Sequence, residues 1–130
     1  MLVLDASAAL EACASPDGFR AFGGEELVAP PLLWSEARSV LHEAVWRGRW
    51  TAAQALATLD RLEAGRIAVR SHRRLSREAW RIADEFGWAK TSDAEYVALA
   101  LLLRCRLVTL DGALQRAVAR LGIVVGPTEL

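Results

Sequence analysis

The strongest candidates for catalytic residues in this sequence are four acids from distant parts of the chain: Asp5, Glu36, Asp93 and Asp111. Asp5 directly follows the apolar run 2–4 and Asp111 follows the run 106–110, and each run is typical of a short buried strand. The carboxyl ends of parallel strands meet at one edge of a sheet, where ligands bind. We therefore expect Asp5 and Asp111 to lie at the same edge.

Glu36 and Asp93 are predicted to lie on helices and could join the other two acids. Glu36 falls within an apolar stripe of the helix expected after Pro31, so it should point at or beside the core; the stripe comprises Leu33, Ala37, Val40, Leu41, Ala44 and Val45. An ionised carboxylate there is costly unless it is paired, coordinated or protonated. Asp93 lies in the first turn of a helix whose next turns are almost wholly apolar, and the helix dipole favours its charge.

Each acid also has a purely structural interpretation. Glu36 could pair with Arg38 or with an arginine of another element. The three aspartates each lie at the start of a predicted helix, where an aspartate that caps the helix contributes about 1 kcal/mol. Unrelated caps need not converge on one edge, and close carboxylates without a cation would repel one another and raise their pKa values. The coincidence of three such positions with Glu36 therefore favours a shared site.

The chemistry of such a site follows from its ligands. Carboxylate oxygens with no histidine or cysteine nearby select a hard cation, so we expect Mg²⁺ or Mn²⁺. A hydrated ion held in this way can orient a water for in-line attack on a phosphodiester and shield the leaving oxygen. Ser7 and Thr109 flank Asp5 and Asp111 by two residues and could hydrogen-bond the carboxylates or the waters of the ion; alternatively, each bonds the local backbone in a turn. Neither hydroxyl has a neighbouring histidine base, so a serine nucleophile is not expected.

Hydrophobic periodicity and turn residues predict the elements that must hold these side chains. Strands are expected at 2–5, 26–29, 67–70, 106–110 and 123–126. Helices are expected after Asp5, from Pro31 to about Arg47, from a Thr51 cap to about Glu63, from a Ser76 cap to Gly87, over 93–104, and from Asp111 to Gly122. Strands that alternate with helices predict an α/β fold, a sandwich with a central, mostly parallel sheet.

Composition limits the domain organisation and the class of partner. A chain of 130 residues with 53% hydrophobic content suits one compact domain over residues 1–130. Sixteen basic residues balance sixteen acidic ones, so nucleic-acid binding would have to come from local patches. The longest apolar run, 96–103, is far shorter than the ~20 residues that span a bilayer, and the first residues lack a signal segment. We therefore expect a cytoplasmic protein with no membrane partner.

Four segments that contain the acids form a set: 3–8 (VLDASA), 30–36 (PPLLWSE), 92–100 (SDAEYVALA) and 107–111 (LVTLD). Together they resemble the PIN-domain ribonucleases, most closely the VapC-like toxins of bacterial toxin–antitoxin pairs. The resemblance spans essentially the whole chain and implies a PIN-like α/β/α sandwich. It also implies metal-dependent endonucleolytic cleavage of RNA, homodimerisation, and inhibition by a small cognate antitoxin protein whose tail covers the acidic cleft.

The resemblance also implies roles for single residues. The principal metal ligands would be Asp5 and Asp93. The acidic site would be completed, directly or through water, by Glu36 and Asp111. The small hydroxyl positions often seen beside such sites are matched by Ser7 and Thr109.

Two sets of side chains could serve partners, and each has a structural alternative. Three tryptophans lie on or beside the helices expected after Pro31: Trp34, Trp46 and Trp50. They could line a groove for an antitoxin helix, although core packing explains them equally well. An RNA backbone could lie along a basic stripe formed by Arg70, Arg73, Arg74, Arg77 and Arg81. The pattern favours the alternative, a solvated face paired with Glu78, Asp84 or Glu85.

Two other functions remain open. The same acids would serve a metal-dependent nuclease that acts on DNA, since the phosphodiester chemistry is the same. The chain could also be a catalytically silent α/β module that binds a partner protein, with its aspartates acting as helix caps.

Overall fold

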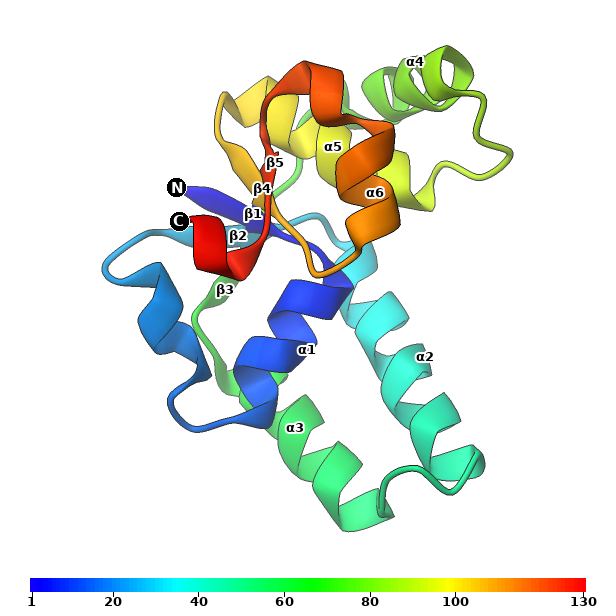
Figure 1. Ribbon diagram of the computed structural model, residues 1–130. Helices are drawn as coiled ribbons and strands as arrows, with labels where there is room; N and C mark the ends of the chain where they lie inside the picture. Colours follow the sequence, from blue (N-terminus) through cyan, green and yellow to red (C-terminus); the bar gives the residue numbers. More distant parts are fainter.

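The computed structural model describes all of residues 1–130 and contains one five-stranded sheet (Figure 1). Its strands are β1 (Leu2–Leu4), β2 (Leu27–Ala29), β3 (Ile67–Val69), β4 (Arg106–Val108) and β5 (Val124–Val125). Their order across the sheet is β3-β2-β1-β4-β5, and every neighbouring pair is parallel. The expected α/β class is confirmed, and the sheet is wholly parallel.

Helices cover both faces of the sheet. On one side lie α1 (Ala6–Ala14), α2 (Leu32–Trp46) and α3 (Ala52–Ala64), and on the other lie α4 (Leu75–Phe86), α5 (Ser92–Leu103) and α6 (Gly112–Ala117) (Figure 1). Two short 3-10 turns lie between these elements, Gly18–Phe22 and Ala119–Leu121, and a third, Pro127–Glu129, follows β5. Parallel strands require crossover connections of a fixed right hand, so the change of direction after β3 moves the later helices to the opposite face.

Strand β1 lies at the point where the chain reverses its direction across the sheet. The chain proceeds from β1 to β2 and β3 on one side, and then returns to β4 on the other side of β1. Leu4 is paired with Val108, which brings the residues that follow these two strands side by side. Ligands of open parallel sheets bind at such a reversal, outside the carboxyl ends of the strands.

The expected boundaries of β4 and α4 differ from the structure. Thr109 and Leu110 lie beyond β4, which ends at Val108, because the chain turns there toward α6. Helix α4 begins at Leu75 with Arg74 at its N-cap, so Ser76 lies inside the first turn and is not the cap. The predicted cap of α3 is confirmed, since Thr51 accepts a hydrogen bond from the backbone of Gln54 in a full capping box.

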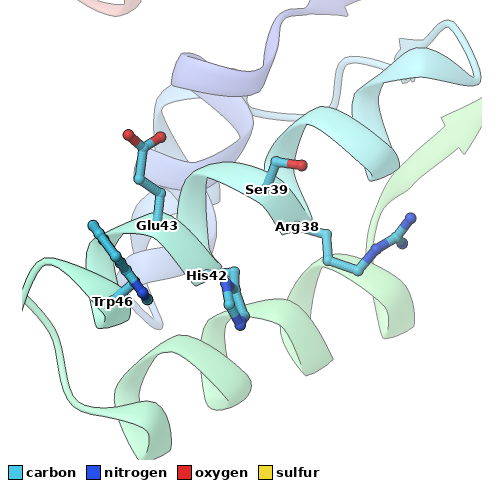
Figure 2. A pocket seen from close by; sticks show the side chains of 5 residues that line it. All are labelled: Arg38, Ser39, His42, Glu43 and Trp46. Atoms are coloured by element: carbon cyan, nitrogen blue, oxygen red, sulfur yellow. The ribbon is translucent and has the colours of Figure 1, made fainter.

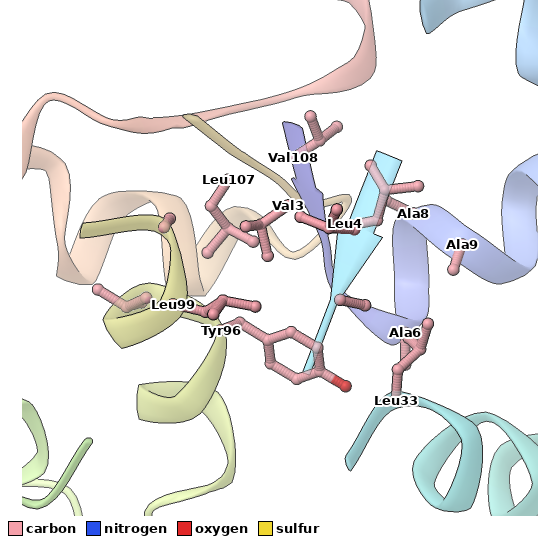
Figure 3. Packing of buried hydrophobic residues seen from close by; sticks show 14 of the residues in the cluster. Val3, Leu4, Ala6, Ala8, Ala9, Leu33, Tyr96, Leu99, Leu107 and Val108 are labelled. Carbon is pink, nitrogen blue, oxygen red and sulfur yellow. The ribbon is translucent and has the colours of Figure 1, made fainter. Parts of the chain in front are cut away.

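The core centres on β1, β4 and the apolar helix α5, whose residues 96–100 are all buried (Figure 3). On α2, the expected inward face is buried at Leu33, Ala37 and Leu41. Val40, which was expected in the same stripe, is 47% exposed. Helix α2 extends away from the sheet and packs on α3 and α1, and Val40 lies on a side of the helix that these neighbours leave open (Figure 1). None of the helices is both long and apolar enough to cross a membrane.

Candidate active site

Asp5 occupies the end of β1 and caps α1 from a nearly buried position, with 7% of its surface exposed. Its Oδ1 accepts hydrogen bonds from the Ser7 hydroxyl at 2.6 Å and from the backbone N–H of Ala8 at 3.0 Å. Its Oδ2 accepts a hydrogen bond from the Thr109 hydroxyl. A carboxylate offers about four lone-pair positions, so these three donors fix its orientation and still leave capacity for one more ligand.

Ser7 and Thr109 connect the two strand ends. The two hydroxyl oxygens lie 3.3 Å apart, and each also accepts a backbone N–H: Ser7 from Leu110 and Thr109 from Asp111, both at 3.0 Å. Both hydroxyls bind the Asp5 carboxylate, and Thr109 also bonds its local backbone, so both expected interpretations apply to Thr109. The backbone partner of Ser7, Leu110, is 103 residues away, so the local-backbone alternative is wrong for Ser7, which instead stabilises the turn after β4. The network ties the start of α1 to the start of α6.

Glu36 lies half-buried on α2 and forms no ion pair, so the expected alternative of a partner such as Arg38 is wrong. Its Oε1 accepts a hydrogen bond from the Tyr96 hydroxyl at 3.1 Å. Burial raises the pKa of Glu36, and the charges of Asp93, Asp5 and Glu95 raise this pKa further, while the hydrogen bond from Tyr96 opposes the shift. These charges act on Glu36 because the acids share one region of the molecule.

Asp93 and Asp111 lie on the exposed rim of this region. Asp93 makes no capping hydrogen bond to α5; partial burial raises its pKa, and the charges of Asp111 and Asp5 raise it further. The cap interpretation therefore does not account for Asp93. Asp111 does cap α6, since its Oδ1 accepts hydrogen bonds from the N–H groups of Ala113 at 2.9 Å and Leu114 at 3.2 Å. Its Oδ2 makes no hydrogen bond within the protein and remains free for another ligand.

The four acids form a linked acidic site whose donor chemistry suits a hard cation, because all the ligands are carboxylate oxygens. The acids do not enclose a metal ion completely, because no group of three or more acidic, histidine or cysteine side chains lies close enough together to bind one ion directly. Mg²⁺ usually binds one or two protein carboxylates and keeps several waters. The residues present therefore fit such an ion through one or two direct ligands, with the other acids acting through water.

Comparison with known proteins identifies the fold family. The model of the family described as PIN domain matches residues 2–120. The chain belongs to the PIN-domain family. It is 39% identical to "VapC ribonuclease Mb0985" of Mycobacterium bovis and to "Ribonuclease VapC9" of Mycobacterium tuberculosis, over 85% of this chain and 86% of each relative. The resemblance to VapC-like PIN-domain ribonucleases is thereby confirmed.

A solved structure agrees with this PIN-domain fold. The crystal structure of PAE2754 from Pyrobaculum aerophilum superposes with a TM-score of 0.79 over 98% of this chain and 90% of that one, at 25% sequence identity. The expected PIN-like sandwich is therefore confirmed by the fold itself.

Tyr96 and Glu95 of this PIN domain belong to the surroundings of the site but were not predicted from the sequence. Tyr96 was assigned only to an apolar core helix, although a hydroxyl in the middle of a buried helix must find a partner. Tyr96 follows Asp93 by three residues, which places both on one side of α5. This spacing was the sequence signal that could have assigned Tyr96 to the site. Glu95 is half-buried, and burial raises its pKa.

The tryptophans separate into different environments. Trp34 packs against the core, Trp50 is half-buried, and Trp46 is 80% exposed. Trp46 borders a hollow of about 440 Å³ on α2, together with Arg38, Ser39, His42 and Glu43 (Figure 2). On the adjoining side of α2, a groove of about 360 Å³ against α3 is lined mainly by apolar side chains, among them Leu41, Val45, Ala55, Leu56 and Leu59.

The basic stripe is only partly neutralised. Arg81 pairs with Glu78 at 2.5 Å and with Glu85 at 3.2 Å, as the solvated-face alternative predicts. Arg70 lies 3.8 Å from Glu26. The three remaining members, Arg73, Arg74 and Arg77, are exposed and form no ion pair.

Proposed function

We propose that this protein is an endoribonuclease that cleaves RNA phosphodiester bonds and acts as the toxin of a toxin–antitoxin pair. The observation that carries the proposal is the set of four acids around the carboxyl ends of β1 and β4, in a chain that is 39% identical to proteins named as VapC ribonucleases. Such an arrangement at the reversal point of a parallel sheet is a binding position for a charged ligand. RNA is the substrate, and the cytoplasm is the compartment in which we expect it to be cut.

We assign Asp5 and Asp93 as direct ligands of Mg²⁺ or Mn²⁺, with Glu36 and Asp111 bound directly or through water. The bound cation would activate a water and neutralise charge on the phosphate. Ser7 and Thr109 keep the Asp5 carboxylate in one orientation through their hydrogen bonds. Glu36, whose pKa is raised by burial, suits a group that takes a proton from the attacking water.

Paired acid variants test this function. Asp5→Asn and Asp93→Asn should abolish cleavage of total RNA while the circular dichroism spectrum stays that of the folded protein, and a chelator should stop the wild type. Asp60→Asn is the matched control, because Asp60 is exposed on α3 and forms no ion pair. Normal cleavage by the two active-site variants would show that the assignment is wrong.

One observation favours the silent module: Asp5 and Asp111 are genuine helix caps, as that function requires. Calorimetric titration with Mn²⁺ separates the two functions. A nuclease should show saturable heat that disappears in Asp93→Asn, whereas a silent module should show none in either protein. Digestion of DNA beside RNA separates the two nucleases.

We also propose a cognate antitoxin and a homodimer as partners. Support for the antitoxin comes from the exposed Trp46 and the adjoining apolar groove between α2 and α3, which suit the apolar face of a helix. Support for RNA contact outside the acidic site comes from Arg73 and Arg77, which are exposed and carry no partner charge. Light scattering of the purified protein measures whether two copies associate.

A further inference from the structure

Tyr96 links the buried core to the acidic site. Its side chain is 1% exposed, and its ring lies in the core cluster beside β1 (Figure 3). Figure 3 shows the hydroxyl directed away from α5 toward Ala6 and Leu33, at the starts of α1 and α2. The phenol oxygen is the one polar atom of this side chain, and the partner to which it donates is Oε1 of Glu36, at 3.1 Å.

This contact leaves the two carboxylate oxygens of Glu36 in different situations. Oε1 is held by a donor that the packed core keeps in place, whereas Oε2 makes no hydrogen bond within the protein. A glutamate side chain has several rotatable bonds, and without a partner it would sample many rotamers. The fixed phenol therefore restricts which oxygen can take another ligand.

The position of Tyr96 on α5 couples Glu36 to Asp93. Tyr96 follows Asp93 by three residues, so both lie on neighbouring positions of one helix face. Helix α5 packs on β1 and β4, the two strands that precede Asp5 and Thr109. One rigid, buried helix thus carries one acid of the site and the donor that holds another.

We propose that Tyr96 is a positioning residue of the acidic site: its hydroxyl holds Oε1 of Glu36 and leaves Oε2 as the oxygen that meets the cation or its water. This inference rests on the proposed function, because it concerns the same acids. It assigns no proton transfer to Tyr96. It requires only that the loss of the hydroxyl acts through Glu36.

Tyr96→Phe removes the hydroxyl and keeps the ring. We expect it to weaken Mn²⁺ binding in calorimetry about tenfold, and to lower kcat for a short RNA by a similar factor with KM unchanged, as for a lost hydrogen bond to a charged group. In a Glu36→Gln background the same change should have no further effect on Mn²⁺ affinity, because residues that act through one another are not additive. Leu99→Met, a volume-conserving change one turn along α5, is the control and should leave Mn²⁺ affinity unchanged.

Each outcome decides the inference. Equal losses of Mn²⁺ affinity from Tyr96→Phe in both backgrounds, or no loss in either, would overturn it and assign Tyr96 to packing alone. If Tyr96→Phe does not fold, Glu36→Asp carries the test: it keeps the charge but withdraws the carboxylate from the phenol, and wild-type Mn²⁺ affinity would overturn the inference. Failure of the proposed function looks different, since wild-type protein would then neither bind Mn²⁺ nor cut RNA, and the inference would fall with it.

Discussion

Thr109→Val should destabilise the protein because Thr109 is fully buried and its hydroxyl has two partners. The hydroxyl donates to Oδ2 of Asp5 and accepts the backbone N–H of Asp111 at 3.0 Å. A hydrogen bond to a charged group contributes about 1.5–3 kcal/mol, and an N–H left without a partner costs about 1 kcal/mol or more when buried. Valine keeps the branched shape, so backbone preference does not change. Because the bond from the Asp111 N–H is only partly buried, its loss counts for less than the full penalty, and we expect the free energy of unfolding to fall by about 2–3 kcal/mol.

The assay is urea unfolding followed by tryptophan fluorescence, with a thermal melt as a check. A loss of that size corresponds to a drop in Tm of roughly 6–15 °C for a chain of this length. Thr58→Val is the matched control: Thr58 is also buried, 2% exposed, but its hydroxyl donates only to the carbonyl of Gln54 within α3. That change should cost less than about 1 kcal/mol, since the carbonyl keeps its place in the helix. Equal costs for the two variants would refute the network as the source of stability around Asp5.

The remaining predictions concern the acids and the basic stripe. Because burial and neighbouring charges raise the pKa of Asp93, the folded protein binds its proton more tightly than the unfolded chain, so its charge destabilises the fold as pH rises from the ordinary carboxyl range through the raised pKa. Asp93→Asn should therefore have a higher Tm than wild type at pH 7 without metal and a similar Tm at low pH; a lower Tm at pH 7 would contradict this. Arg77→Ala should weaken RNA binding and reduce the slope of log affinity against log salt by about one, whereas Arg81→Ala, which loses a partly neutralised charge, should change the slope less; equal slopes by filter binding would contradict it.

The sequence predicted the parts of the site that depend on local pattern. The apolar runs before Asp5 and Asp111 are strands because buried parallel strands are short and continuously hydrophobic, and this pattern is visible without any partner. The same holds for the Thr51 capping box, which needs only four consecutive residues. The start of α4 was predicted wrongly because its N-cap residue, Arg74, makes no side-chain capping bond that the sequence could reveal.

Contacts between distant segments could not be predicted in the same way. The bond from Thr109 to Asp5 joins residues 104 positions apart and exists because β4 pairs beside β1, which is a property of strand order and not of either segment. The exposure of Val40 likewise depends on how far α2 extends beyond the sheet. A helical stripe shows which residues share a face, but the neighbour that covers the face is set by the whole fold.

The structural and chemical interpretations of the aspartates, which looked like alternatives in the sequence, are compatible in the folded chain. Asp5 caps α1 with Oδ1, yet its second oxygen accepts a hydrogen bond from Thr109, which follows another strand, and capping alone does not need this contact. Asp111 caps α6 with Oδ1 and leaves Oδ2 free. A capping hydrogen bond fixes a carboxylate at a helix N-terminus without using all its lone pairs. The remaining lone pairs can therefore still bind a ligand at the edge of the sheet. Asp93 makes no cap, and its raised pKa reflects a charge that the fold partly buries and keeps near other acids without stabilising it. For that reason Asp93 is the residue at which stability and function should separate most clearly.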